Sequence, residues 1–225
     1  MNPEASNFSA TTNETPTAPV WDRDYILKFI KDQAQLVGEF DNVLQHCLKV
    51  EQVALAIGKL VHLSSSQLEL LGKSALLHDA GKKFEVLGRK SDLFKDRFEA
   101  EEMAQFWLHF KGVPDEILAV MRGTDMPAAQ EYLEGGLSGP QNWLARILFF
   151  ADEIVDDTEV VPWRVRIKAW SDPELFRPRA EYQGQSLKKV ESKLAAFVGY
   201  QIRDKAGIPR GVDLIALLKA EISTI

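Results

Sequence analysis

Residues 41–61 read DNVLQHCLKVEQVALAIGKLV, and the pattern of their apolar side chains decides the fold class. The apolar residues recur at steps of three and four, which is the period of an α-helix with one buried face. They are Val43, Cys47, Val50, Ala54, Ile57 and Val61. We find no sustained alternation of polar and apolar residues, the pattern typical of a half-buried strand. The sequence therefore predicts an all-α protein.

Similar patterns predict further helices on both sides of this stretch. We expect them over residues 22–37, 66–80, 100–111, 114–122, 140–155, 187–206 and 214–222. Ser66 and Glu69 form a capping-box signature at the start of one helix. Gly81 is placed to end this same helix, and Gly112 and Gly207 are placed to end two of the others. Residues 135–140 and 156–183 are expected to form loops or short helices because they contain several Gly or Pro residues.

Composition and charge define which classes of function suit the chain. Its 225 residues are enough for one sizeable helical domain with its own core. Hydrophobic residues make up 45% and charged residues 27%, as in an ordinary globular protein. The net charge of −6 argues against an extended face for nucleic acid, which needs concentrated Lys and Arg. A small phosphate ligand would need only a local basic pocket.

The ends of the chain and its cysteine content suggest an organisation and a compartment. Residues 1–18 are rich in Asn, Ser, Thr and Pro and are expected to be a disordered tail. Residues 19–225 then form one domain with a C-terminal helical extension. The single cysteine, Cys47, excludes an internal disulfide and fits a reducing cytoplasm. We see neither a secretory signal nor a membrane span, so we expect a cytoplasmic protein without a membrane partner.

Imidazole and carboxylate groups lie at positions that favour a metal site. His46 lies beside the apolar stripe of its helix, and His78 and Asp79 are adjacent near the end of another. Asp152 lies in an otherwise apolar helix, where a charge is costly unless it is paired or bound to a metal. Nitrogen and oxygen ligands together suit divalent ions such as Mn²⁺, Fe²⁺, Co²⁺, Ni²⁺ or Zn²⁺. The sequence therefore predicts one ion held by His46, His78, Asp79 and Asp152.

The adjacency of His78 and Asp79 restricts where such an ion could lie. Adjacent residues of a regular helix point roughly 100° apart. An ion shared by both residues must therefore lie against the edge of the helix, or the turn must be distorted. Gly81 would make such a distortion easier.

The ordered set of His46, His78-Asp79 and Asp152 resembles the signature of the HD-domain metal-dependent phosphohydrolases. Residues 78–82, HDAGK, are similar to the His-Asp-X-Gly-Lys form of its central motif, and the resemblance covers about residues 40–157. It implies an HD-domain helical bundle that binds a divalent ion, Mg²⁺ included. It also implies hydrolysis of a phosphate ester or anhydride, in a nucleotide, by a metal-activated water. Asp79 would also orient this water, and Lys82 would steady the phosphate.

A finer resemblance is to bacterial HD hydrolases that split dinucleoside tetraphosphates symmetrically. The helix order and the sequence Phe149-Phe150-Ala151-Asp152 are similar to that branch. Its members carry two further histidines for a second metal, and the corresponding neighbourhoods here hold Phe98 and Thr124. We therefore expect one ion per chain and a single-metal nucleotide phosphohydrolase.

Several positions allow more than one interpretation. Arg122 and Asp125 could line the cleft and bind substrate, or they could have structural roles. Asp152 could pair with a basic residue instead of a metal, either Arg146 or Lys168. The whole chain could also be a non-catalytic HD module that binds a nucleotide or a protein partner in signalling. We prefer the enzyme because the primary ligand set is intact.

Overall fold

The computed structural model describes residues 19–37, 41–84, 97–124, 143–169, 181–182 and 185–223. Most of these residues are helical, as predicted. The longer helices are α1 (Arg23–Val37), α2 (Asp41–Leu60), α3 (Ser65–Leu77), α5 (Arg97–Phe110), α8 (Trp143–Glu153) and α10 (Leu187–Lys205). The shorter ones are α6 (Asp115–Met121), the 3₁₀ helix η1 (Arg122–Thr124), α9 (Trp163–Ala169) and α11 (Leu214–Ile222).

Strands are confined to two short antiparallel pairs within the described ranges. β1 (Val155–Asp156) pairs with β2 (Glu159–Val160), and β3 (Glu181–Tyr182) pairs with β4 (Gln185–Ser186). The all-α class is therefore confirmed. Among the described helices, none is both long and apolar enough to cross a membrane.

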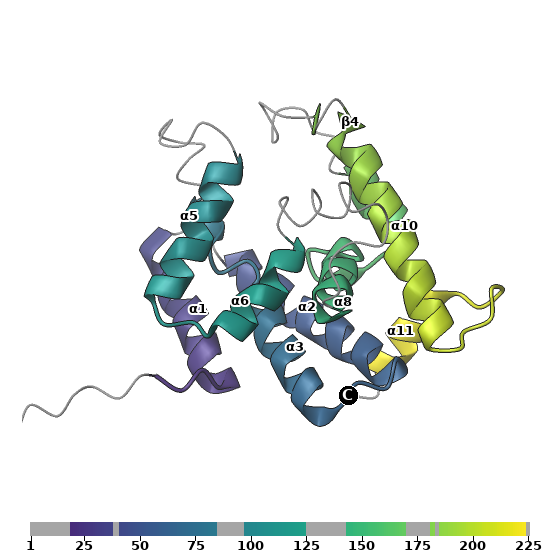
Figure 1. Cartoon of the computed structure of the whole chain (residues 1–225), viewed down its shortest axis with the longest axis horizontal. Helices are drawn as coiled ribbons and strands as arrows, with labels where there is room; N and C mark the ends of the chain where they lie inside the picture. The colour runs from purple at the N-terminus through teal and green to yellow at the C-terminus, as the bar shows by residue number, and fades with distance from the viewer. Residues whose placement is uncertain are drawn as a thin grey trace, which may run out of the picture.

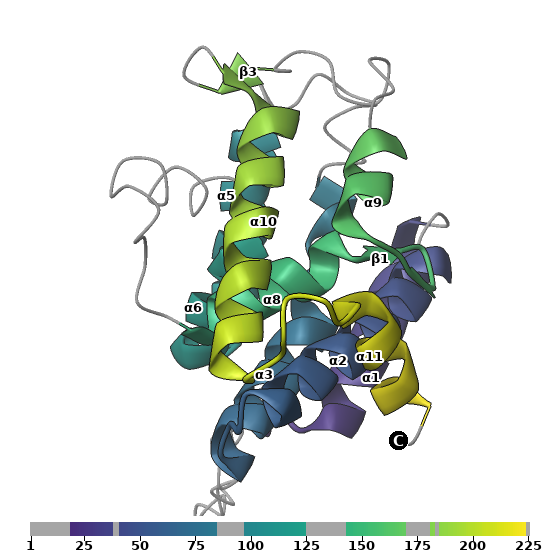
Figure 2. The same cartoon turned by 90° about the vertical axis from the view of Figure 1, so that its right-hand side faces the viewer.

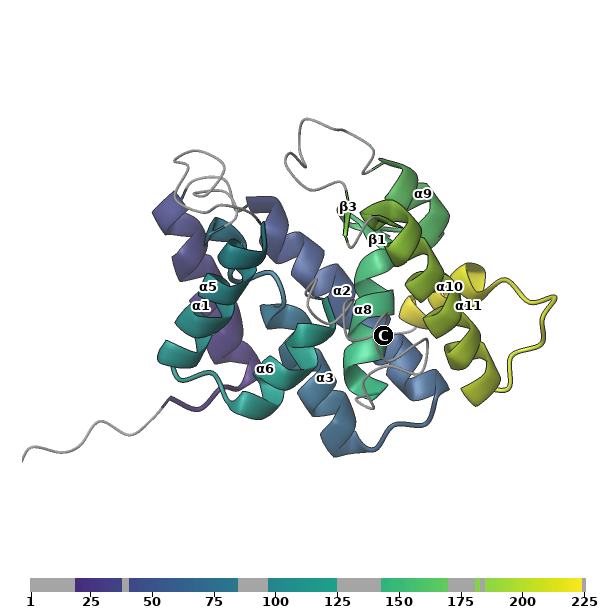
Figure 3. The same ribbon diagram turned by 45° about the horizontal axis from the view of Figure 1, so that its top comes forward.

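The helices form a row of packed groups (Figure 1). α1 and α5 lie at one end, α2, α3, α6 and α8 lie in the middle, and α10 and α11 lie at the other end. The view in Figure 2 shows α9 and α11 beside α10, and Figure 3 shows the three helices gathered at the same end. Within the middle group, the most extensive contacts are those of α2 with α3, followed equally by α2 with α8 and α3 with α6. The middle helices therefore have neighbours on both sides.

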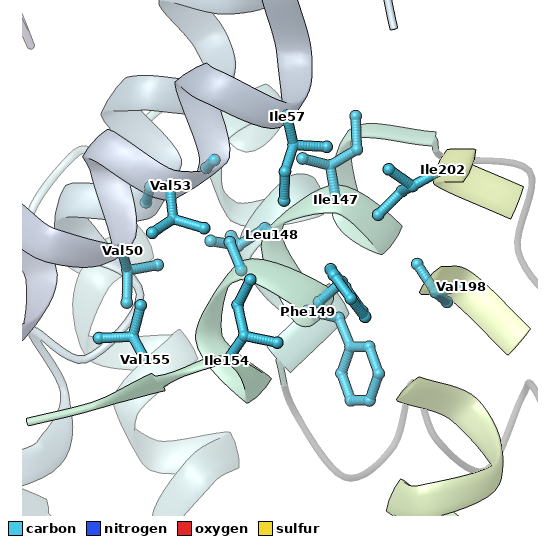
Figure 4. Close-up of a cluster of buried hydrophobic side chains, with 14 of the residues drawn as sticks. Val50, Val53, Ile57, Ile147, Leu148, Phe149, Ile154, Val155, Val198 and Ile202 are labelled. Carbon is cyan, nitrogen blue, oxygen red and sulfur yellow. The ribbon is translucent and has the colours of Figure 1, made fainter. Parts of the chain in front are cut away.

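The main core lies around α8, as Figure 4 shows. Ile147 and Leu148 of α8 are fully buried and lie near Val53 and Ile57 of α2. On the α10 side, the core continues through buried aliphatic residues such as Val198. A second cluster joins α1, α3, α5 and α6. Because α8 is apolar on nearly all sides, the position of its one partly exposed acidic residue, Asp152, is fixed by packing.

The helix ends mostly follow the sequence, with one correction. The capping box of α3 is formed by Ser64 and Gln67, so the prediction of Ser66 with Glu69 is wrong. The chain offers three consecutive serines here, and the helix begins two residues earlier than the Ser66 cap required. Gly112 and Gly207 adopt positive φ angles of 82° and 65° just beyond α5 and α10, as expected of C-terminal stops.

Gly81 has a different role from the predicted one. Its φ angle is not positive, so it does not end α3 as a left-handed residue. α3 ends at Leu77, and hydrogen bonds from Ala80 N to Leu77 O and from Lys82 N to Asp79 O continue the chain in tight turns. A Cβ atom on Gly81 would lie 2.3 Å from the Cβ atom of Ala104 in α5. Gly81 is therefore required for close contact between this turn and α5.

Parts of the predicted organisation lie outside the described residues. These are the tail over residues 1–18, the loop over 135–140, and the start of the α8 helix near Pro140. The segment 156–183, expected to be irregular or to contain short helices, includes the β1–β2 hairpin and the seven-residue helix α9.

Candidate metal centre

His46 projects from the N-terminal half of α2 with both ring nitrogens engaged. Its Nδ1–H donates to the backbone carbonyl of Asp157, at 3.2 Å. Its Nε2 lies 3.0 Å from Oδ1 of Asp152. Asp157 lies in the turn between β1 and β2 at a φ angle of 54°, a left-handed conformation that Asp tolerates better than most residues. A backbone carbonyl therefore fixes the ring so that Nε2 faces the carboxylate, as is common for metal-binding histidines.

His78 caps the C-terminus of α3 and is held in the same way. Its Nδ1–H donates to the backbone carbonyl of Ala75, at 2.7 Å. Its Nε2 is buried without a hydrogen-bond partner and lies 3.6 Å from Oδ1 of Asp152 and 3.8 Å from Oδ2 of Asp79. Burial lowers the pKa of His78, but the charge of Asp79 and the nearby Asp152 carboxylate raise it well above its ordinary value. In the absence of a metal, the imidazole is therefore stabilised in its protonated form.

Asp152 projects from α8 into this space and is paired with a basic side chain. The Nη2 atom of Arg166, on α9, lies 3.2 Å from Oδ1 of Asp152, and its Nη1–H donates to the Asp152 backbone carbonyl. Burial raises the pKa of Asp152, but the charge of Arg166 and the hydrogen bond with His46 hold it well below its ordinary value. Asp152 is therefore ionised and pairs with Arg166, not with Arg146 or Lys168.

Asp79 lies at the edge of the cluster, next to Lys82. Its Oδ1 is 3.6 Å from Nζ of Lys82, and the Asp79 side chain is 23% exposed. Burial raises the pKa of Asp79, but the charges of Lys82 and His78 outweigh this effect and lower it to about 2. The carboxylate is therefore ionised at neutral pH. Lys82 therefore lies beside the Asp79 carboxylate, and its predicted contact with a phosphate stays a prediction.

The ligand atoms of His46, His78 and Asp152 lie within 4.8 Å of one another, so these three residues could hold a metal ion. They come from α2, the end of α3 and α8. Two observations fit a cation. Both imidazoles donate through Nδ1, which leaves Nε2 to face the centre, and the buried Nε2 of His78 has no hydrogen-bond partner. Asp79 lies beside this triad but outside the group of mutually close atoms.

Cys47 is next to His46 in sequence but is not one of these ligands. The thiol is fully buried, and burial raises its pKa. A thiol must lose its proton to bind a metal, and burial disfavours this loss.

The remaining candidate positions are separate from the triad or cannot be placed. Arg122 is exposed at the start of η1 and makes no ion pair or side-chain hydrogen bond with the described cluster residues. Asp125 lies outside the described residues. His62 is exposed in the turn after α2. His109 is also exposed, and its Nδ1 lies 3.2 Å from Oδ1 of Asp115 on the surface.

Two contributors to the site were missed from the sequence. Arg166 lies in a segment whose prolines suggested irregular structure, although Trp163 to Ala169 form a helix. The carbonyl of Asp157 could not be identified because it depends on a hairpin turn two residues long.

No family model matches this chain, and no curated protein or solved structure matches it.

Proposed function

We propose that this protein is a metal-dependent phosphohydrolase of the HD-domain type, acting on a phosphate ester or anhydride of a nucleotide. The observation that carries the proposal is the meeting of His46, His78 and Asp152, from three helices, around an unpaired imidazole nitrogen. A structural ion-pair network would not need two histidines whose Nδ1 atoms are both bound to backbone carbonyls.

In this proposal, each polar residue of the cluster has a distinct role. His46, His78 and Asp152 hold one divalent ion, and Asp79 joins them as the fourth ligand. Such an ion would polarise a phosphoryl oxygen and lower the pKa of water. With a pKa of about 2, Asp79 is an acceptor that can orient a water molecule, but it cannot act as the acid. Lys82 contributes a positive charge beside Asp79 for a phosphate oxygen.

Arg166 adds a role to those predicted from the sequence. It is almost fully buried and holds both the carboxylate and the backbone carbonyl of Asp152. A carboxylate oxygen has two lone pairs, so Oδ1 of Asp152 can accept from Arg166 and still face an ion. We assign Arg166 as a positioning residue.

The Arg166 pairing also favours a second candidate, a non-catalytic HD module. Asp152 is paired with Arg166 and His46 without any ion, so the cluster is partly satisfied as a purely structural element. Such a module would bind a nucleotide or a protein partner without turnover.

The test combines metal analysis with phosphate release from a panel of nucleotides in the presence of Mn²⁺, Co²⁺ or Mg²⁺. We expect about one ion per chain and hydrolysis of at least one nucleotide. Asp79→Ala should lower the rate by at least ~10²-fold at saturating metal, because it removes the group that orients the water. His109→Ala is the matched control, since this histidine is on the surface and should leave the rate unchanged.

The outcomes separate the two candidates. If the wild-type protein binds a nucleotide but hydrolyses none of the panel, the hydrolase proposal is wrong and the non-catalytic module takes its place. Full activity in Asp79→Ala would show that the role given to Asp79 is wrong.

A further inference from the structure

A cavity of about 340 Å³ lies between α8, α9, α10 and the start of α11, away from the metal centre. Figure 3 shows α9, α10 and α11 gathered at one end of the molecule. Phe150 of α8 lines the cavity, whereas Asp152 belongs to the cluster. Side chains two positions apart in a helix differ in direction by roughly 200°. Phe150 and Asp152 therefore leave α8 on opposite sides. His46, His78 and Asp79 do not line the cavity.

The walls of the cavity are apolar and include aromatic rings. Phe150, Trp163 and Tyr200 contribute their rings, and Ala195 and Ala196 leave space between them. Gly199 also lines the cavity, and a Cβ atom there would lie 2.8 Å from the ring of Phe150. The volume is at the lower end of the ~300–1,000 Å³ typical of small-molecule sites. It therefore suits a ligand of one or two rings.

Two arginines at this cavity have no acidic partner among the described residues. The guanidinium of Arg164 lies 4.5 Å from the centre of the Trp163 ring, and this stacking is its only side-chain interaction there. Arg203 donates through Nη1 to the backbone carbonyl of Val212 at 2.8 Å, and more weakly to that of Pro209. A guanidinium has five N–H donors, so others remain for a ligand.

The one acidic residue that lines the cavity does not offset these charges. Oδ1 of Asp213 accepts from the backbone N–H groups of Ile215 and Ala216, at 2.9 and 3.3 Å. Asp213 is thus the N-cap of α11, where its charge is balanced by the positive end of the helix. The cavity therefore combines aromatic walls with a net positive charge, in a chain whose overall charge is −6.

We propose that this cavity binds a small aromatic anion, a molecule of one or two rings that carries one carboxylate or a similar acidic group. The rings lie against Phe150, Trp163 and Tyr200, and the acidic group lies between Arg164 and Arg203. This site is independent of the metal centre and of the hydrolase proposal.

The test uses 2-naphthoate as the probe, with 2-naphthamide as the neutral analogue of the same shape. Binding to the full chain is measured by ligand-observed NMR titration in the presence of a chelator, so that the metal centre does not contribute. At ~0.3–0.4 kcal/mol per non-hydrogen atom, the dissociation constant of a 13-atom ligand should be on the order of 0.1–1 mM. The amide should bind at least about fivefold more weakly, because the charge-assisted hydrogen bonds are lost.

Two variants locate the binding within the molecule. Ala196→Phe places a ring in the cavity and should abolish naphthoate binding, whereas Ala119→Phe, at an exposed position of α6, should leave it unchanged. The double variant Arg164→Gln/Arg203→Gln should make the acid bind as weakly as the amide. Arg210→Gln, on the exposed α10–α11 connection, is its control.

Circular dichroism and thermal melts confirm that each variant is folded before it is titrated. No binding of naphthoate at 5 mM, equal binding of acid and amide, or unchanged binding to folded Ala196→Phe would each overturn the proposal. None of these results depends on metal binding or phosphate release, so failure here leaves the hydrolase proposal to its own test.

Discussion

At the scale of single residues, His78 is the member of the triad that has a buried polar atom without a hydrogen-bond partner. Its Nε2 is buried without a partner, which typically costs about 1–3 kcal/mol. Its position next to two carboxylates offsets this cost through protonation, and a bound cation would offset it by direct ligation. A proton and a metal ion therefore compete for the same nitrogen.

This competition predicts how stability depends on pH. The pKa of His78 is raised above 6.5, so its stabilising effect is complete below about pH 6.5 and is lost as the pH rises through the folded-state pKa. The pKa of Asp152 is lowered below 3.8, so its stabilising effect is present above about pH 4 and is lost as the pH falls further. Melting temperatures in chelator should therefore peak between about pH 4 and 6.5.

Metal should change this profile, because it binds only the deprotonated imidazole. With saturating Mn²⁺ or Co²⁺, the peak of melting temperature should move toward higher pH. Melts recorded from pH 4 to 9 with and without metal provide the comparison. A peak at the same pH in both series would contradict metal ligation by His78.

The Arg166–Asp152 pair gives a second prediction. Arg166→Met leaves a largely buried carboxylate without its main cationic partner, and we expect a loss of about 3 kcal/mol in the free energy of unfolding without metal. A bound cation would restore part of this loss, so added metal should stabilise Arg166→Met more than wild type. Arg164→Met, at the exposed neighbour on α9, should change stability by no more than about 0.5 kcal/mol. Equal metal stabilisation of Arg166→Met and wild type would argue against an ion next to Asp152.

At the scale of elements, the turn after α3 is held by its contact with α5. The backbone of residues 78–82 carries the HDAGK motif, and Gly81 brings it against Ala104. This contact holds the turn that carries His78 and Asp79 close to α5. It also explains why a glycine is needed there without a positive φ angle.

The contact predicts that Gly81→Ala costs about 1–3 kcal/mol in stability, since the new Cβ atom overlaps with that of Ala104. Ala104→Gly alone should cost about 0.5–1 kcal/mol from helix propensity. In the double variant, the loss should be smaller than the sum of the single losses, because removing the Ala104 Cβ makes space. Chemical denaturation of the four proteins in this cycle measures the coupling. Additive losses would show that the close contact is not what requires glycine.

The elements also show what could be predicted from the sequence. The helices follow from residue periodicity, which is a local pattern. The meeting of His46, His78 and Asp152 is expected from an ordered motif whose members lie up to 106 residues apart. Arg166 and the carbonyl of Asp157 reach the site only because a tight hairpin turns α9 back onto α8. A turn of this kind depends on tertiary packing, and the prolines of its neighbourhood obscured the short helix.

At the scale of the whole molecule, the candidate ligands join helices that contribute to both core clusters. α3 supplies Leu71 and Ala75 to the cluster around α8, and Leu76 and Leu77 to the cluster around α1 and α5. An ion at the end of α3 would therefore bind together parts of the molecule that pack largely on different sides of this helix.

Metal should accordingly raise the melting temperature of the whole protein. At a free concentration of 100 times the dissociation constant, binding stabilises the folded state by ~2.7 kcal/mol, which corresponds to roughly 5–11 °C for a chain of this size. His46→Ala and His78→Ala should lose this shift, and His109→Ala should retain it. The measurement is a thermal melt of each protein after chelator treatment and again with metal. An equal shift in all four proteins would place the ion elsewhere.

The pairing of His46 with Asp152 joins positions 106 residues apart. During synthesis, α2 and α3 leave the ribosome well before α8 is made. At roughly 5–20 residues per second, the delay between His78 and Asp152 is on the order of 4–15 s. In that interval, the two imidazoles have no carboxylate from α8 to complete the triad. An ion would therefore be captured with native affinity only after α8 has been synthesised and has packed against α2, so any loading of metal would follow the packing of α8.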